Sequence, residues 1–144
     1  PPTYINHDPV RIEIHKRIAS LNKMQDLEDL KQELLDRFGP IDIDMMTYMY
    51  EKLYKKLGHQ VGIEKTVHEK DFVKMVISLE KSELIDGMRL LYVASKSKMN
   101  IRLGQSRGHV EINMSTKHET KHWLYLACEL LEMYIDSKEI TINE

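Results

Sequence analysis

The sharpest catalytic pattern in the chain is His118-Glu119-Thr120-Lys121-His122, which has the form H-E-x-x-H. On a helix, histidines at this spacing share one face and can bind zinc, while the glutamate acts as general base on the bound water. However, Thr116 and Glu119 have capping-box spacing, which gives Glu119 a structural role at a helix start. No later histidine supplies a third ligand. We therefore predict exposed histidines and no metal site, with a zinc hydrolase as the remote alternative.

Other enzymatic motifs are missing from the sequence. The segment from Gly104 to Gly108 lacks the Lys-Ser/Thr pair of a phosphate-binding loop, and no Gly-x-Ser-x-Gly elbow occurs. The single cysteine, Cys128, lies among apolar residues and is expected to be a buried, inert thiol. The sequence therefore predicts no catalytic residue and no cofactor in this chain.

Basic residues collect between residues 95 and 121, where Glu111 and Glu119 are the only carboxylates. Those near the predicted second hairpin are Lys96, Lys98, Arg102 and Arg107. Such a patch can contact a phosphate backbone. No aromatic residue lies among the cations to stack on bases, so a solvated strand surface is the favoured interpretation. A DNA- or polymerase-contacting module using the basic hairpin 96–121 is the alternative.

A second polar cluster lies near the end of a predicted helix. Glu33, Asp36 and Arg37 are spaced i, i+3 and i+4, so their side chains are neighbours on the helix surface. The helix dipole disfavours a carboxylate such as Asp36 in the last turn. A contact beyond the helix is one explanation for Asp36. The other is a simple Glu33–Arg37 surface pair, worth about 0.2–0.5 kcal/mol.

Apolar spacing predicts the elements that carry these residues. In the first part, helical spacing predicts helices over about residues 8–20, 22–38 and 42–58. The middle helix ends where Gly39 tolerates a left-handed cap and Pro40 forbids continuation. Its apolar stripe consists of Leu27, Leu30, Leu34 and Phe38.

The period then changes to the alternation that is typical of strands. Strands are predicted over 61–67, 72–79, 99–103 and 110–114. A helix over about 82–95 is expected between the two hairpins, buried through Leu84, Met88 and Leu91, and a last helix over 116–137. The fold class is therefore α+β: three N-terminal helices followed by β-hairpin, helix, β-hairpin and helix.

Length and composition indicate one compact domain over residues 1–144, with a helical part (1–58) and a mixed α/β part (59–144). The 21 basic and 23 acidic side chains give no global reason to bind nucleic acid or a membrane surface. One cysteine and the lack of a long apolar run indicate a cytoplasmic location. The Pro1-Pro2 start suggests a fragment of a longer protein.

Two stretches of this chain carry a family motif. Tyr4-Ile5, Asp8, Arg11 and Arg17-Ile18, followed by Glu33-Leu34-Leu35-Asp36-Arg37-Phe38-Gly39-Pro40, resemble the C-terminal domain of bacterial transcription-repair coupling factor (Mfd). The resemblance is sharpest over residues 4–40. Two positions depart from the pattern: His15 replaces a tyrosine, and Asp42 replaces a second proline.

The resemblance implies a parent protein that is an ATP-dependent DNA translocase, with ATP and Mg in an upstream motor. That parent displaces stalled RNA polymerase from DNA and recruits UvrA for nucleotide excision repair. The C-terminal domain would be non-catalytic and would mask the UvrA-binding surface of the parent's UvrB-like N-terminal module. The family motif carries Glu33, Asp36 and Arg37 over as the partner-binding residues. We therefore expect an autoinhibitory protein-interaction domain.

Overall fold

The computed structural model describes residues 4–139. Contacts divide the chain into two compact units, the first ending at Leu57 and the second beginning at Gly58. This division adjoins the boundary that the sequence predicted after residue 58. That the two units form one domain stays a prediction.

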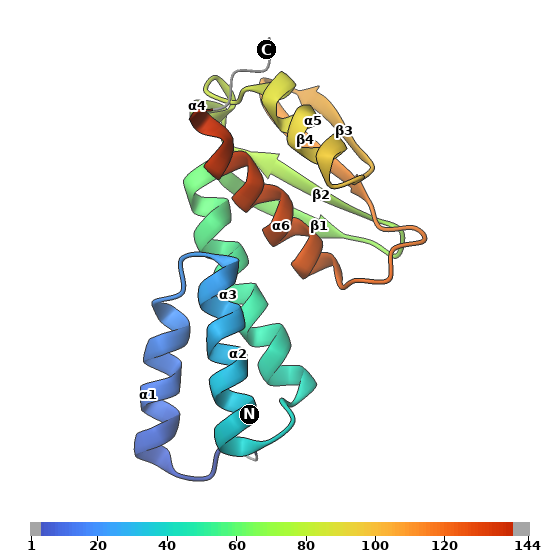
Figure 1. Ribbon diagram of the computed structural model, residues 1–144. Helices are drawn as coiled ribbons and strands as arrows, with labels where there is room; N and C mark the ends of the chain where they lie inside the picture. Colours follow the sequence, from blue (N-terminus) through green and yellow to red (C-terminus); the bar gives the residue numbers. More distant parts are fainter. Residues whose placement is uncertain (1–3, 140–144) are drawn as a thin grey trace. The chain divides into compact units, whose positions relative to one another are not determined.

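The first unit contains helices α1 (Asp8–Ala19), α2 (Met24–Phe38) and most of α3 (Ile43–Val61). The three helices lie side by side (Figure 1) and confirm the helical first part. Each presents an apolar stripe to a common core, as helical periodicity requires. Fully buried members of that core are Ile14, Ile18, Leu27, Leu30, Leu34, Met49 and Leu53. Asp42 caps α3, because its carboxylate accepts a hydrogen bond from Asp44 N at 2.7 Å.

Helix α3 does not end at Gly58, as the sequence suggested. It continues to Val61 and stops at Gly62, whose φ of +101° lies in the region that only glycine adopts without strain. The amide of Gly62 still bonds to the Gly58 carbonyl at 2.8 Å, and the Gly62 carbonyl accepts from Ser78 N at 2.8 Å. The turn after the helix is thereby fixed to the end of a strand.

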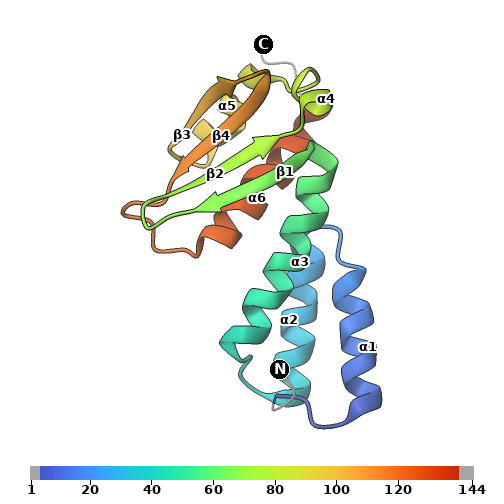
Figure 2. The same cartoon turned by 180° about the vertical axis from the view of Figure 1, so that it is seen from behind.

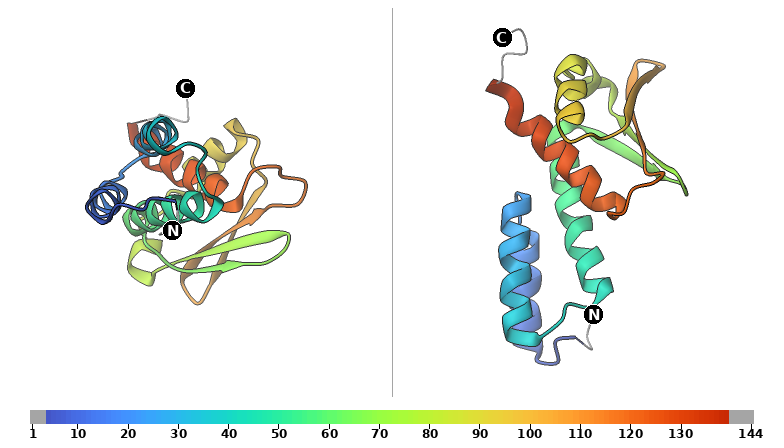
Figure 3. Two further views of the ribbon diagram at one scale, coloured as in Figure 1. Left: turned by 90° about the horizontal axis from the view of Figure 1, so that it is seen from below. Right: turned by 45° about the vertical axis from the view of Figure 1, so that its right-hand side comes forward.

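The second unit is built on a four-stranded antiparallel sheet in the order β1-β2-β4-β3. Its strands are β1 (Ile63–His68), β2 (Phe72–Ile77), β3 (Ile101–Ser106) and β4 (His109–Ser115). Helices α5 (Gly87–Lys96) and α6 (Trp123–Asp136) cover one face of this sheet (Figures 2 and 3). A short α4 (Leu79–Ser82) follows β2, and a 3-10 turn, η1 (Ser137–Glu139), follows α6. The α+β class and both hairpins are confirmed.

The helix expected over residues 82–95 is wrong in its start and in its buried face. Asp86 caps α5 by accepting from Arg89 N at 3.1 Å, so the helix begins at Gly87. Both sides of this segment are apolar, so helical periodicity alone does not decide which side is buried. The buried residues are Leu90, Val93 and Ala94. The expected core residues Leu84, Met88 and Leu91 are instead 71%, 70% and 45% exposed.

The last helix is also shorter than predicted. It begins at Trp123, and residues 116–122 form an irregular connection from β4. The buried stripe of α6 closes the core of the second unit against Val73, Met75, Ile77, Ile112 and Met114. Within residues 4–139, no helix has the length and apolar character that crossing a membrane requires.

Two glycines in this region should respond to alanine in opposite directions. Gly62→Ala should lower the free energy of unfolding by about 1–2 kcal/mol or more, because its φ is positive and a new Cβ would overlap the Lys81 side chain. Gly58→Ala should raise it by about 0.5–1 kcal/mol, because Gly58 is inside α3 and its Cβ would lie 3.6 Å from Ile63 Cβ. Urea unfolding measures both. Equal effects of the two substitutions would contradict this account of where α3 ends.

Candidate functional site

Helix α2 presents the three predicted partner-binding residues at its C-terminal end. Leu27, Leu30 and Leu34 are fully buried, so the remaining sides of the helix face α1 or solvent. The structure places Glu33 and Arg37 together on the side that faces α1. Asp36 lies elsewhere on the helix, so the predicted trio does not form one cluster.

The carboxylate of Glu33 is shared by two arginines on different helices. It forms an ion pair with Arg17 of α1 and accepts from Arg37 Nη1 at 2.9 Å. The hydrogen bonds from Arg17 and then Arg37 hold the pKa of Glu33 below its usual range. Arg37 also lies 3.8 Å from Glu13 of α1. These alternating charges connect α1 to α2 across their partly exposed edge.

The end of α2 is fixed by aromatic contacts. The Arg37 guanidinium lies 5.0 Å from the centre of the Phe38 ring, and the Tyr4 ring packs edge-on against Phe38 at 6.0 Å. The Tyr4 hydroxyl donates to the Gly39 carbonyl at 2.8 Å and lies 3.3 Å from the Leu34 carbonyl. Burial raises the pKa of the Tyr4 hydroxyl above its usual value. These hydrogen bonds attach the segment before α1 to the C-terminal end of α2.

Asp36 differs from its neighbours because its carboxylate is exposed and makes no hydrogen bond or ion pair within residues 4–139. The adjacent Leu35 is 44% exposed, which adds apolar surface at the same end of α2. A carboxylate in the last turn gains nothing from the helix dipole. Asp36 is therefore the member of the trio that is available to another surface.

The structure confirms the Glu33–Arg37 pair that the sequence offered as one alternative, but sequence reasoning missed the partners on α1, Arg17 and Glu13. Arg17 and Tyr4 belong to the family motif, but only the fold brings them to α2. The available signal was their place in the motif together with the expected antiparallel packing of consecutive short-linked helices. Several motif residues thus stabilise the packing of the first unit and do not face a partner.

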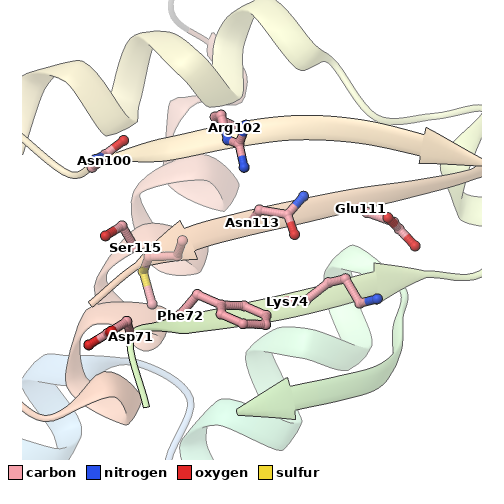
Figure 4. Close-up of a pocket in the computed structure, with 9 residues that line it drawn as sticks. Asp71, Phe72, Lys74, Asn100, Arg102, Glu111, Asn113 and Ser115 are labelled. Atoms are coloured by element: carbon pink, nitrogen blue, oxygen red, sulfur yellow. The ribbon is translucent and has the colours of Figure 1, made fainter. Parts of the chain in front are cut away.

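The four cations of the basic segment do not form one patch. Lys96 ends α5 and lies 5.2 Å from the Tyr92 ring, and Lys98 follows in the turn before β3. Arg107 lies in the turn after β3, about 20 Å from Lys98 along a six-residue strand. Arg102 lies between them on the open face of the sheet (Figure 4). The predicted continuous basic hairpin is therefore not what the fold assembles.

The H-E-x-x-H segment is not helical, which removes the geometry on which the zinc alternative depended. His118 has a φ of +69°, and Glu119 lies in the same connection before α6. His122 is the N-cap of α6, and its Nδ1 accepts from Leu124 N at 3.1 Å. The capping box expected at Thr116 and Glu119 is thus wrong. In the part of the chain that the structure describes, no group of three or more His, Cys, Asp or Glu side chains is arranged around a common metal position.

Cys128 is fully buried in α6, as expected from its apolar neighbours. Burial, and secondarily the charge of Glu132, raises the pKa of the thiol to about 12. The thiolate that nucleophilic chemistry requires is therefore not populated at neutral pH.

Comparison with known proteins gives consistent relatives. The TRCF domain model matches residues 1–90. The transcription-repair-coupling factor of Bacillus subtilis is 30% identical over 146 residues, which cover 99% of this chain and 12% of that protein. The transcription-repair-coupling factor of Staphylococcus haemolyticus is 24% identical over 126 residues, which cover 86% of this chain and 10% of that protein. The chain therefore spans roughly a tenth of the length of these curated relatives.

A solved structure shares the fold. The crystal structure of a C-terminal domain of transcription-repair coupling factor superimposes with a TM-score of 0.74 at 21% identity, covering 96% of this chain and 87% of that chain. The similarity extends beyond the segment that the family model matches.

The Arg17–Glu33 pair should show measurable coupling. A double-mutant cycle with Arg17→Gln and Glu33→Gln, measured by urea unfolding at pH 7, should give a coupling free energy of about 0.2–1 kcal/mol between the two side chains. Because folding lowers the pKa of Glu33, this stabilisation is complete above the unfolded value of about 4.3 and disappears as the pH falls through the folded value. As a control, Arg17→Gln and Asp36→Asn should be additive. Zero coupling for Arg17 and Glu33 would show that the pair does not connect the helices.

The two histidines of the connection should differ in their effect on stability. His122→Ala should lower the free energy of unfolding by about 0.5–2 kcal/mol because α6 loses its cap, and His122→Asn should restore most of it. His118→Ala should have little effect. Thermal melts with and without zinc complete the test: a zinc-dependent rise in Tm that His118→Ala abolishes would contradict the capping role.

Proposed function

This chain belongs to the TRCF domain family, the C-terminal domain of transcription-repair coupling factors, and from that premise we propose that it is a non-catalytic, autoinhibitory interaction domain. Its partner is the UvrB-like N-terminal module of the same parent protein. Bound there, the domain masks the surface that recruits UvrA. The ATP-dependent motor and the contacts with DNA and RNA polymerase belong to the rest of the parent.

The observation that carries this proposal is the exposed carboxylate of Asp36, which has no ion-pair partner within residues 4–139 and lies beside the charged edge of α1 and α2. Arg37 is only partly exposed but retains donors beyond those used by Glu33 and Glu13. Leu35 supplies apolar area next to Asp36. A carboxylate, a guanidinium and an apolar side chain on one helix end suit a small protein contact with a polar rim.

The three motif residues have different roles in this proposal. Glu33 keeps α1 and α2 in register through Arg17, so it acts on the partner indirectly by positioning Arg37. Asp36 contacts the partner directly. Loss of Glu33 should therefore weaken both the unit and the contact, whereas loss of Asp36 should weaken the contact alone.

A contact made of partly exposed charges fits a latch that has to open. Shifting a latch from 99% closed to 99% open takes about 5.5 kcal/mol of differential binding. Exposed ion pairs contribute about 0.2–1 kcal/mol each, so several hold the closed state and engagement of the motor can still release it. Their attraction is screened by salt, which makes the closed state sensitive to ionic strength.

Charge reversal at Asp36 tests the latch. In the parent protein, Asp36→Arg should raise UvrA binding and basal ATPase activity several-fold, because the closed state loses an ion pair and gains a repulsion. In trans, the affinity of this chain for the isolated UvrB-like module should fall about tenfold, which corresponds to about 1.4 kcal/mol. Isothermal titration calorimetry and an ATPase assay measure these changes.

Asp29→Arg is the matched control, because Asp29 is an exposed aspartate on the same helix two turns earlier. It should leave UvrA binding, ATPase activity and affinity for the module unchanged. In this chain, both variants should have the same urea midpoint of unfolding as the unsubstituted chain. If Asp36→Arg changes neither UvrA binding nor module affinity, or if Asp29→Arg changes them equally, the proposal fails.

A further inference from the structure

The sheet of the second unit has a polar face opposite α5 and α6. Side chains alternate along β2, so Val73 and Met75 enter the core while Phe72 and Lys74 point to the other side. Figure 4 shows this other side, where side chains from β2, β4 and β3 lie next to one another. A cavity of about 590 Å³ lies on this face and is lined by residues of all three strands.

Two cations flank an amide across the middle of this face. Lys74 pairs with Asn113, and Asn113 pairs with Arg102, so the three side chains form one row across β2, β4 and β3. Strands lie about 4.8 Å apart, which places the ends of the row about 10 Å from each other. Within residues 4–139, neither Lys74 nor Arg102 forms an ion pair. Their positive charge can attract an anion, and the carboxylates of Asp71 and Glu111 border the same space.

An aromatic ring lies in the neighbouring row. Phe72 pairs with Ser115 across β2 and β4, and 41% of its surface is exposed. It comes from the first hairpin, whereas Arg102 comes from the second. Sequence reasoning found no aromatic residue among the cations because Phe72 and Arg102 are thirty residues apart and only the sheet places them on the same face.

The third row contains a glycine, which leaves space above the sheet, and a carboxylate. Gly104 pairs with Glu111 and has no side chain of its own. A Cβ placed there would lie 3.6 Å from Asn113 Nδ2 and 3.8 Å from Glu111 Oε1, so an amide donor and a carboxylate acceptor border the same space. These are the groups that read the edges of nucleobases.

We propose that this face binds single-stranded nucleic acid. A base stacks on Phe72, backbone phosphates lie against Lys74 and Arg102, and Asn113 with Glu111 contacts the edge of a neighbouring base. A duplex does not fit, because its bases are stacked on one another and cannot reach the ring. An acidic peptide fits less well, because it carries no base to stack on Phe72 or to contact Asn113 and Glu111.

Fluorescence anisotropy with labelled ten-nucleotide oligo-dT and oligo-rU tests this proposal, since both share the stacking and phosphate chemistry. The chain should bind both strands in the micromolar range, and a duplex of the same length at least tenfold more weakly. Phe72→Leu keeps an apolar side chain but removes the ring, and should weaken binding about tenfold. Phe72→Trp should retain it.

Two pairs of charge-neutralising substitutions distinguish binding at this face from nonspecific attraction between the chain's positive charges and a polyanion. Lys74→Gln with Arg102→Gln should weaken binding more than tenfold and reduce the slope of log affinity against log salt by about 1.4, the value for two phosphates on a single strand. Lys96→Gln with Lys98→Gln removes the same charge elsewhere and should change affinity less than twofold. Tighter binding of oligo-dT would identify the ligand as single-stranded DNA, and tighter binding of oligo-rU would identify it as RNA. Both results support the proposal.

Four results would overturn the proposal: no binding to either strand, equal binding of duplex or poly-glutamate, an unchanged affinity for Phe72→Leu, or an equal loss in the two charge-neutralised pairs. Thermal melts of each variant establish that losses of affinity occur in folded protein. This face consists of second-unit residues and the end of α2 belongs to the first unit, so the two proposals are tested on different residues and can fail independently.

Discussion

The shared carboxylate of Glu33 is the charged interaction that connects α1 to α2 at the edge of their apolar core. One acidic group meets Arg17 from α1 and Arg37 from its own helix, and Arg37 in turn approaches Glu13 and covers Phe38. Apolar stripes bring α1 and α2 together but are tolerant of sliding, whereas paired charges at the rim fix one register. Placement of the helix end that carries Asp36 follows from that register.

The family motif therefore contains two kinds of residue that a sequence cannot separate. Tyr4 and Arg17 are as much part of the motif as Asp36, yet the fold uses them internally, through the Gly39 carbonyl and the Glu33 carboxylate. Asp36 stands out only once its surroundings are known. Spacing within α2 identified the polar cluster, but three residues at i, i+3 and i+4 span too wide an arc to share every neighbour.

Periodicity predicted the elements better than it predicted their faces. Apolar residues at a period near 3.6 located α1, α2 and α3, and alternation located both hairpins, because these patterns reflect burial directly. It failed where two sides of a helix are about equally apolar: in α5 the side of Leu90 is buried, whereas Met88 and Leu91 are exposed. The loop carrying His118 was missed because caps compete locally, and His122 supplies the one that α6 uses. The placement of Phe72 and Arg102 on one face of the sheet depends on strand order, which no local pattern encodes.

The burial of Cys128 has a practical consequence. It is the single cysteine of the sequence, and its raised pKa and full enclosure in α6 leave it in the unreactive protonated form at neutral pH. A cysteine introduced on the surface would then be the one thiol open to maleimide chemistry, with no need to delete the natural residue and disturb the core. The chain is thus ready for site-selective attachment of a fluorophore or spin label.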